Sequence, residues 1–223
     1  MNKLIRFALA LSGAALVFGA IAAPMRDNGT GASAAVGGPV ILGGDDLTDH
    51  GSVDIDGNLV QGWLYMQRAL ENIEPNVTRS NDGSIAALGS GESASTCCDA
   101  GAAIGFAAAK VGLTVDYYNG ADAINGFFDD LESGAAKPAI IWVAGNGAAN
   151  NLDSQDEIDA LSTNAASINS FVNSGGGLFS HGTNYEWLQA LLPGSLTVDG
   201  GNSGDLYFTD EGLDALPALT DSD

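Results

Sequence analysis

Short runs rich in apolar and β-branched residues recur along the chain and predict β-strands. They cover residues 39–42, 84–88, 113–118, 138–143 and 178–180. The run at 138–143, Pro-Ala-Ile-Ile-Trp-Val, is apolar throughout, which is typical of a central parallel strand covered on both faces. Two further strands are expected at residues 196–198 and 206–208.

Between these strands the apolar residues recur with helical spacing. The first helical pattern has its apolar positions at Trp63, Leu64, Met66, Leu70 and Ile73. Further helices are expected at residues 99–111, 121–131, 154–173 and 185–192, with a last helical turn at 211–216. Ser154 and Glu157 form a capping box that marks the start of the helix over 154–173.

Strands that alternate with helices predict an α/β fold, with a doubly wound, mostly parallel, flavodoxin-like sheet flanked by helices. In such a sheet, ligands bind beyond the carboxyl ends of the strands. The loops after the expected strands are rich in Gly, Asn, Asp and Ser, although loops generally are. The candidate ligand-binding residues are therefore Gly44, Asp45, Asp46, Asn146, His181 and Asn184.

The N-terminus has the three parts of a secretory signal peptide. Lys3 and Arg6 are basic, residues 7–17 form an apolar run too short to span a bilayer, and Ala20-Ile21-Ala22 is a small-x-small cleavage site. We therefore expect residues 1–22 to be removed during export. The mature chain is expected to be secreted, periplasmic or on the cell surface, without a membrane anchor.

The rest of the chain divides into a linker and one domain. Residues 23–38 are rich in Gly, Ala and Ser and lack periodicity, which predicts a flexible linker. Residues 39–223 are expected to form a single α/β domain, and the natural chain could continue past Asp223.

Acidic residues outnumber basic ones by 28 to 7. After removal of the signal peptide, the basic residues are Arg26, Arg68, Arg79, Lys110 and Lys137. Such a surface repels the phosphates of nucleic acids and anionic lipids, so neither is expected as a partner. The loop at 89–92, Gly-Ser-Gly-Glu, lacks the lysine of a Walker motif and is not expected to bind phosphate. The acidity favours divalent cations and tolerance of salt.

Cys97 and Cys98 are the only cysteines, and they are adjacent. A bond between neighbours departs from ordinary disulfide geometry. Two cysteines are also too few for a disulfide scaffold or a four-ligand zinc site. We expect a pair at the start of a helix that is buried or slow to oxidise, and we assign it no function.

The segment after the first strand is a candidate Ca²⁺ site, with aspartates at Asp45, Asp46, Asp49, Asp54 and Asp56. Residues 54–58 begin like a calcium loop, but Leu59 and Tyr65 stand where an EF-hand has its glycine and its bidentate glutamate. An EF-hand is therefore excluded. A looser Ca²⁺ site stays open, and so does the alternative of a solvated loop with an Asp-Gly turn. The two histidines, His50 and His181, are too few for the usual three-ligand catalytic zinc site unless a carboxylate completes it.

The second half of the chain resembles a known superfamily. A helix opened by residues 154–157 is followed by Phe-Val-Asn-Ser-Gly-Gly-Gly-Leu-Phe-Ser-His-Gly at 171–182. This order of helix, glycines, strand and His-Gly is similar to the class I glutamine amidotransferase-like superfamily, and most similar to its ThuA-like branch. The resemblance extends over residues 138–192 and implies an amidotransferase-like α/β fold. Because ThuA-like proteins are linked to sugar metabolism, it also implies a carbohydrate ligand.

The resemblance lacks the catalytic cysteine of that superfamily, because Ser180 follows Leu178-Phe179 where the amidotransferases have Gly-x-Cys. Serine peptidase relatives use Gly-x-Ser-x-Gly, of which Ser180 and Gly182 are present and the first glycine is replaced by Leu178. Ser180 is thus a candidate nucleophile with His50 or His181 as its base.

Two hypotheses follow. The first is an exported, non-catalytic domain that binds a small molecule, a carbohydrate or a surface polymer, with Ca²⁺ as the candidate cofactor. The alternative is a secreted hydrolase that uses Ser180.

Overall fold

A five-stranded parallel sheet forms the centre of the molecule in the computed structural model, which describes residues 37–43, 47–145, 149–152, 154–181 and 186–192. The strands lie in the order β1-β7-β6-β4-β5, and every neighbouring pair is parallel. Their bounds are β1 Val40–Leu42, β4 Ser84–Leu88, β5 Thr114–Tyr118, β6 Ile140–Val143 and β7 Gly177–Ser180. All five strands were predicted from the sequence.

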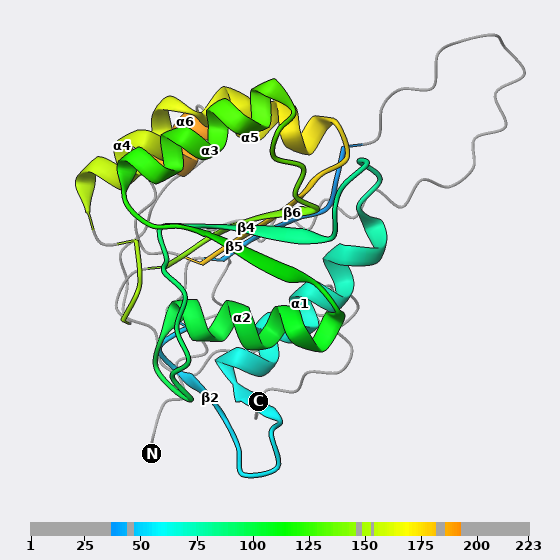
Figure 1. Cartoon of the computed structure of the whole chain (residues 1–223), viewed down its shortest axis with the longest axis vertical. Helices are drawn as coiled ribbons and strands as arrows, with labels where there is room; N and C mark the ends of the chain where they lie inside the picture. The colour runs from blue at the N-terminus through cyan, green and yellow to red at the C-terminus, as the bar shows by residue number, and fades with distance from the viewer. Residues whose placement is uncertain (1–36, 44–46, 146–148, 153, 182–185, 193–223) are drawn as a thin grey trace, which may run out of the picture.

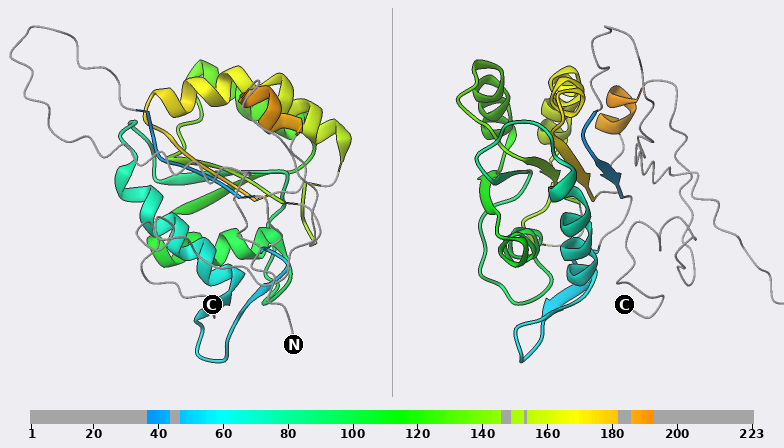
Figure 2. Two further views of the ribbon diagram at one scale, coloured as in Figure 1. Left: turned by 180° about the vertical axis from the view of Figure 1, so that it is seen from behind. Right: turned by 90° about the vertical axis from the view of Figure 1, so that its right-hand side faces the viewer.

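Helices cover both faces of this sheet (Figure 1). One face carries α1 (Gly62–Ile73) and α2 (Ala100–Val111), and α1 continues into the short 3-10 helix η1 (Glu74–Asn76). The opposite face carries α3 (Ala121–Ser133), α4 (Gln155–Thr163), α5 (Ala165–Asn173) and α6 (Glu186–Leu191). Figure 2 shows the same three layers from two further sides. The predicted doubly wound α/β fold is therefore confirmed. No helix within the described ranges is long and apolar enough to cross a membrane.

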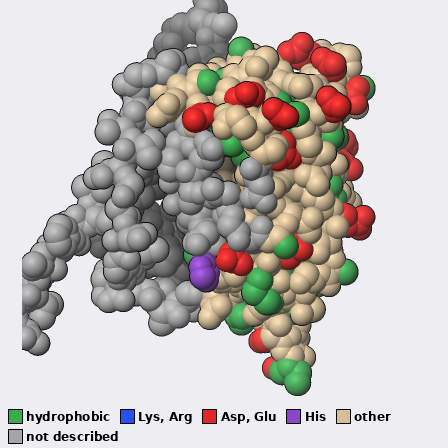
Figure 3. Space-filling model, turned by 90° about the vertical axis from the view of Figure 1, so that its left-hand side faces the viewer, with side chains coloured by type: hydrophobic (Ala, Val, Ile, Leu, Met, Phe, Trp, Pro, Cys, Tyr) green, Lys and Arg blue, Asp and Glu red, His purple; other side chains and the backbone are tan. Residues whose placement is uncertain are grey.

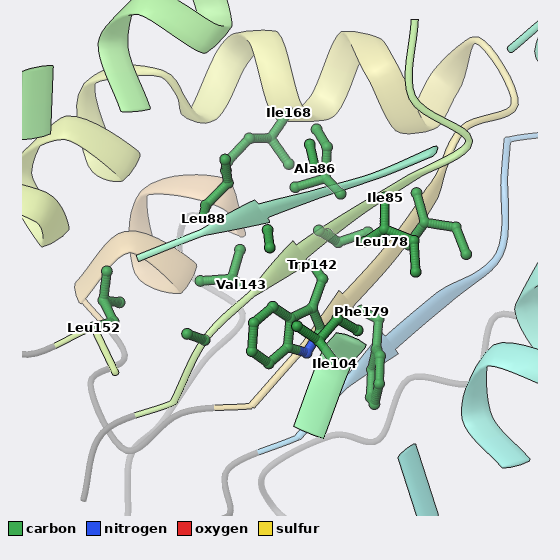
Figure 4. Packing of buried hydrophobic residues seen from close by; sticks show 14 of the residues in the cluster. Ile85, Ala86, Leu88, Ile104, Trp142, Val143, Leu152, Ile168, Leu178 and Phe179 are labelled. Atoms are coloured by element: carbon green, nitrogen blue, oxygen red, sulfur yellow. The ribbon is translucent and has the colours of Figure 1, made fainter. Parts of the chain in front are cut away.

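The two faces of the sheet differ in what they bury. Trp142 and Phe179 are register partners on β6 and β7, and they lie toward Ile104 of α2 (Figure 4). Leu88 follows Ala87, the register partner of Trp142, so its side chain faces the opposite side of the sheet and lies toward Ile168 of α5. All six side chains are fully buried, with relative exposures of 0%. Continuous apolar runs such as 140–143 are thus explained by burial on both faces.

A small antiparallel hairpin was not predicted. Strands β2 (Gly51–Val53) and β3 (Leu59–Gln61) pair within the segment that the sequence indicated to be an acidic loop. The hairpin projects from the α1–α2 side of the molecule (Figure 1). Lys110 of α2 holds it, because its Nζ donates a 2.9 Å hydrogen bond to the Gly57 carbonyl.

The long helix expected over 154–173 is divided into α4 and α5 at Asn164. This residue has φ −94° and ψ 14°, outside the helical region, and its side-chain Nδ2 donates to the Ala160 carbonyl at 2.9 Å. An asparagine side chain that competes for a backbone carbonyl in this way is a known cause of helix interruption.

Several expected features lie outside the described residues. They include the signal peptide at 1–22, most of the linker at 23–38, the strands at 196–198 and 206–208, and the turn at 211–216. Of the linker, Gly37 and Gly38 are described. Gly38 is buried, and its N–H donates to the Val172 carbonyl at 2.7 Å.

The packing of α2 against the loop after β4 depends on a glycine. A methyl group at Gly101 would collide with the carbonyl of Gly91, whereas one at Gly126 of α3 would have no atom within 4 Å. We expect Gly101→Ala to lower the free energy of unfolding by about 1–3 kcal/mol, because the backbones must separate. Gly126→Ala, the matched control, should raise it by about 0.5–1 kcal/mol through helix propensity. Urea denaturation measures both. Equal effects of the two substitutions would contradict this packing.

Candidate functional site

The topology places a switch point between β4 and β6. The chain leaves β4 through α2 on one face of the sheet and leaves the neighbouring strand β6 through α4 on the other. The two connections diverge beyond the carboxyl ends of these strands, which is where open α/β sheets bind ligands. We define the switch-point site by five described residues at this position: Gly91, Ser93, Asp99, Asn119 and Asn150.

Asp99 joins the elements of this site. Its Oδ1 accepts a 2.9 Å hydrogen bond from the backbone N–H of Ala102, so it is the N-cap of α2. Its Oδ2 accepts from Ser93 Oγ at 2.9 Å and from Asn150 Nδ2 at 2.8 Å. The carboxylate therefore connects the helix, the loop after β4 and the loop after β6. With 6% of its surface exposed, it is a buried charge whose hydrogen bonds offset its desolvation.

Two asparagine amides flank Gly91 in the same site. A Cβ placed on Gly91 would lie 3.6 Å from Asn119 Nδ2 and 3.6 Å from Asn150 Oδ1. Asn119 follows β5 and Asn150 follows β6, so loops from three strands meet here. Both asparagines are exposed. Asn150 adopts a left-handed backbone conformation, with φ 58°.

Helix α2 begins at this site, and its N-cap is the carboxylate of Asp99. Tyr117 Oη donates to the Gly101 carbonyl in the first turn of α2 at 3.0 Å. Burial, and then the nearby carboxylates of Glu92 and Asp99, raise the pKa of Tyr117 to about 12. The N-terminus of α2 thus lies beside the carboxylates of Asp99 and Glu92, whereas helix N-termini elsewhere attract anionic ligands.

Figure 3 shows the face of the molecule at the carboxyl ends of the strands, and the described part of this face is also acidic. Acidic side chains are spread over it, and no lysine or arginine is visible among the described residues in that view. Among the described residues of this surface, a phosphate or carboxylate ligand would meet no compensating positive charge, whereas a neutral polar molecule would meet both donors and acceptors.

A buried hydroxyl lies under the same site. Ser90 has an exposure of 0%, and its Oγ has no hydrogen-bond partner among the described residues. The Oγ lies 3.1 Å from the position of a Cβ on Gly101. Since buried polar atoms are nearly always satisfied, an ordered water or a ligand atom is expected next to it.

Cys97 and Cys98 differ from the expectation. They form a disulfide with each other, and both residues are exposed rather than buried. The pair stands immediately before Asp99, at the start of α2 as predicted. General disulfide geometry disfavours a bond between neighbouring cysteines. The chain accommodates it here with Cys98 in a left-handed conformation, at φ 60°.

The proposed Ser180 nucleophile is not paired with a histidine. Ser180 and His181 are consecutive at the end of β7, so their side chains point to opposite faces of the sheet. Ser180 has an exposure of 1%, and its Oγ has no partner among the described residues. His50 is exposed at the start of the hairpin, where its carbonyl accepts from the Gly62 N–H at 2.9 Å.

His181 lies in a cluster of aromatic side chains. Its ring centroid is 4.5 Å from Phe179, 5.9 Å from Tyr65 and 6.1 Å from Trp142, and the residue is fully buried. The other candidate ligand-binding residues, Gly44, Asp45, Asp46, Asn146 and Asn184, lie outside the described residues.

Of the candidate calcium aspartates, Asp54 and Asp56 lie together in the β2–β3 turn, whereas Asp45 and Asp46 lie outside the described residues. Asp54 stabilises the hairpin turn, because its Oδ1 accepts from the N–H groups of Asp56 and Asn58 at 2.9 and 2.7 Å. The Asn58 hydrogen bonds hold the pKa of Asp54 below its usual range. Within the described ranges, no three or more His, Cys, Asp or Glu side chains are grouped to hold a metal ion. For Asp54, the geometry matches the alternative of a solvated turn.

The residues predicted from the sequence and those of the switch-point site lie at the same edge of the sheet but are different residues. Asn119 and Gly91 follow strands and were inside the loops identified as candidates. Asp99 and Asn150 were missed. The signal for Asp99 was its place before an alanine-rich helix, which is typical of an N-cap. Asn150 carries no local signal, because its contact with Asp99 spans 51 positions.

If Asp54 serves the turn, its removal should act independently of calcium. We expect Asp54→Ala to lower the melting temperature by the same amount in EDTA and in CaCl₂. Asp56→Ala, which removes the neighbouring exposed carboxylate, should have a smaller effect. A calcium-dependent stabilisation of the wild type that Asp54→Ala abolishes would contradict this and make Asp54 a ligand. A stabilisation that survives the substitution would point to Asp45, Asp46 and Asp49.

Three comparisons with known proteins found no match for this chain. No protein-family model matches the chain, no curated protein matches it, and no solved structure matches it. The similarity to the amidotransferase-like superfamily therefore rests on the residues at 138–192 alone.

Proposed function

We propose that this chain is an exported, non-catalytic binding domain whose switch-point site takes a neutral, polyhydroxylated ligand such as a carbohydrate. The observation that carries the proposal is the convergence of Asn119, Asn150 and Gly91 from three strand-following loops. Asparagine amides offer both donors and acceptors, which is what hydroxyl groups require. The carboxylates of Glu92 and Asp99 favour neutral over anionic ligands.

Export is supported by two independent features. The N-terminal sequence has the composition of a signal peptide. The Cys97–Cys98 disulfide is of a kind that persists in oxidising compartments and is rare in the cytosol.

The absence of catalysis is proposed from the state of the candidate nucleophile. Ser180 is buried and its Oγ is not hydrogen-bonded to a described imidazole, whereas an activated serine needs an adjacent base. The buried carboxylate of Glu157 is also engaged. It accepts from the Gly120 N–H at 2.7 Å and from Ser154 Oγ at 2.9 Å, which makes it part of the α4 cap. The geometry thus gives the hydrolase alternative no support.

Binding to a printed array of neutral and acidic oligosaccharides tests the proposal. The wild type should bind neutral members and not sulfated or uronate ones. Asn119→Ala and Asn150→Gly should each weaken binding about tenfold, the size expected for one lost hydrogen bond near 1.4 kcal/mol. Glycine is used at position 150 because it tolerates the left-handed φ.

Asn76→Ala is the matched control. Asn76 is an exposed asparagine in η1, which precedes β4 and therefore lies at the opposite, amino end of the sheet. It should bind like the wild type. Absence of binding to every neutral member, or equal binding by all three variants, would refute the proposed function.

A further inference from the structure

We propose that the Cys97–Cys98 disulfide is the apolar wall of the switch-point site, against which the C–H face of a saturated sugar ring packs. This inference rests on the proposed function, because it assumes a polyhydroxylated ligand. It restricts the polyhydroxylated ligands to cyclic sugars, such as pyranoses, and excludes open-chain polyols.

The disulfide is held in place on both sides. Toward the hairpin, the Val53 N–H donates to the Thr96 carbonyl at 2.9 Å, and the Cys98 N–H donates to the Gly51 carbonyl at 3.3 Å. Ser95 Oγ also donates to the Cys97 carbonyl, at 2.7 Å. Toward the site, Cys98 is followed in the sequence by Asp99, whose carboxylate accepts a hydrogen bond from Asn150 Nδ2. The two exposed cysteines thus belong to a fixed loop, which lowers the cost of ordering this loop around a ligand.

A sugar ring needs an apolar contact as well as hydrogen bonds, since its hydroxyl groups surround two C–H faces. Tryptophan side chains supply that contact in many sites, but Trp63, Trp142 and Trp187 have exposures of 0%, 0% and 1%. Ile55, the large hydrophobic side chain that is exposed within the described ranges, lies between Asp54 and Asp56 in the β2–β3 turn. The disulfide is an exposed, polarizable group in the same loop as Gly91 and Ser93.

A purely structural role explains this disulfide poorly. Disulfides stabilise a fold mainly by closing long loops in the unfolded chain, and the effect grows with the number of residues enclosed. Cys97 and Cys98 have a sequence separation of 1, so their bond encloses no loop. Its effect must therefore be local, on the backbone at Cys98 and on the surface that it presents.

The chain has two cysteines, so labelling with [β-¹³C]cysteine gives one carbon signal for each of them. We would titrate the oxidised protein with the methyl glycosides of glucose, galactose, mannose and N-acetylglucosamine, using sorbitol as the open-chain control. For a glycoside that binds, both cysteine signals should shift with the same dissociation constant as the backbone amide of Asn150. Sorbitol should leave the cysteine signals in place.

Reduction with a phosphine provides the second arm. It converts the bond into two thiols and should weaken glycoside binding about tenfold, the size expected when about 50 Å² of apolar contact is lost. The Val53 amide reports whether the loop stays paired with β2 in the reduced protein. If it does not, the titration of the oxidised protein still decides the question.

The outcomes separate the two proposals. A glycoside that shifts the Asn150 amide but neither cysteine signal would overturn the disulfide wall and leave the proposed function standing. Unchanged affinity after reduction, with the Val53 amide still protected, would do the same. If no glycoside shifts either reporter, both proposals fail.

Discussion

The carboxylate of Asp99 is the interaction on which this edge of the molecule depends. It caps α2 through Ala102, and it also binds Ser93 from the loop after β4 and Asn150 from the loop after β6. An isolated buried carboxylate would be strongly destabilising, but three hydrogen bonds compensate this one. A single side chain thus determines how two loops and a helix are placed around the switch point.

This arrangement also determines what the site accepts. In many α/β proteins a helix N-terminus at such a position holds a phosphate. Here the protein's own carboxylate occupies that position, and Glu92 adds a second negative charge nearby. The remaining groups are the amides of Asn119 and Asn150, the buried hydroxyl of Ser90 and the exposed disulfide. Their chemistry is neutral, with polar and apolar parts, which is why we propose a sugar as the ligand.

The sequence was sufficient for the sheet, because its strands are apolar runs with helices between them. It did not predict β2 and β3, since three-residue strands are too short to show an alternating pattern. It did not predict the break at Asn164, which depends on how one side chain competes for the Ala160 carbonyl. These features come from local backbone conformations that periodicity does not encode.

The site itself could be predicted only in part. The rule that ligands bind at the carboxyl ends of strands selected the loops after β4 and β5, which also contribute to the switch-point site. The order β1-β7-β6-β4-β5 is needed to bring the loops after β4, β5 and β6 together, and that order is not visible in the chain. The proposed pairing of Ser180 with His181 could have been doubted from the sequence, because adjacent residues of a strand face opposite sides.

Amide hydrogen exchange of Asp99→Asn tests the central role of this carboxylate most directly. The asparagine oxygen can still accept from the Ala102 N–H, but its NH₂ group cannot accept from Ser93 and Asn150. We expect the body of α2 to keep its protection. The amides of Ala100, which donates to Ala149, and Leu152, which donates to Gly145, should exchange faster together with that of Val53. Unchanged protection at these three amides, or loss of protection along α2 instead, would contradict the account.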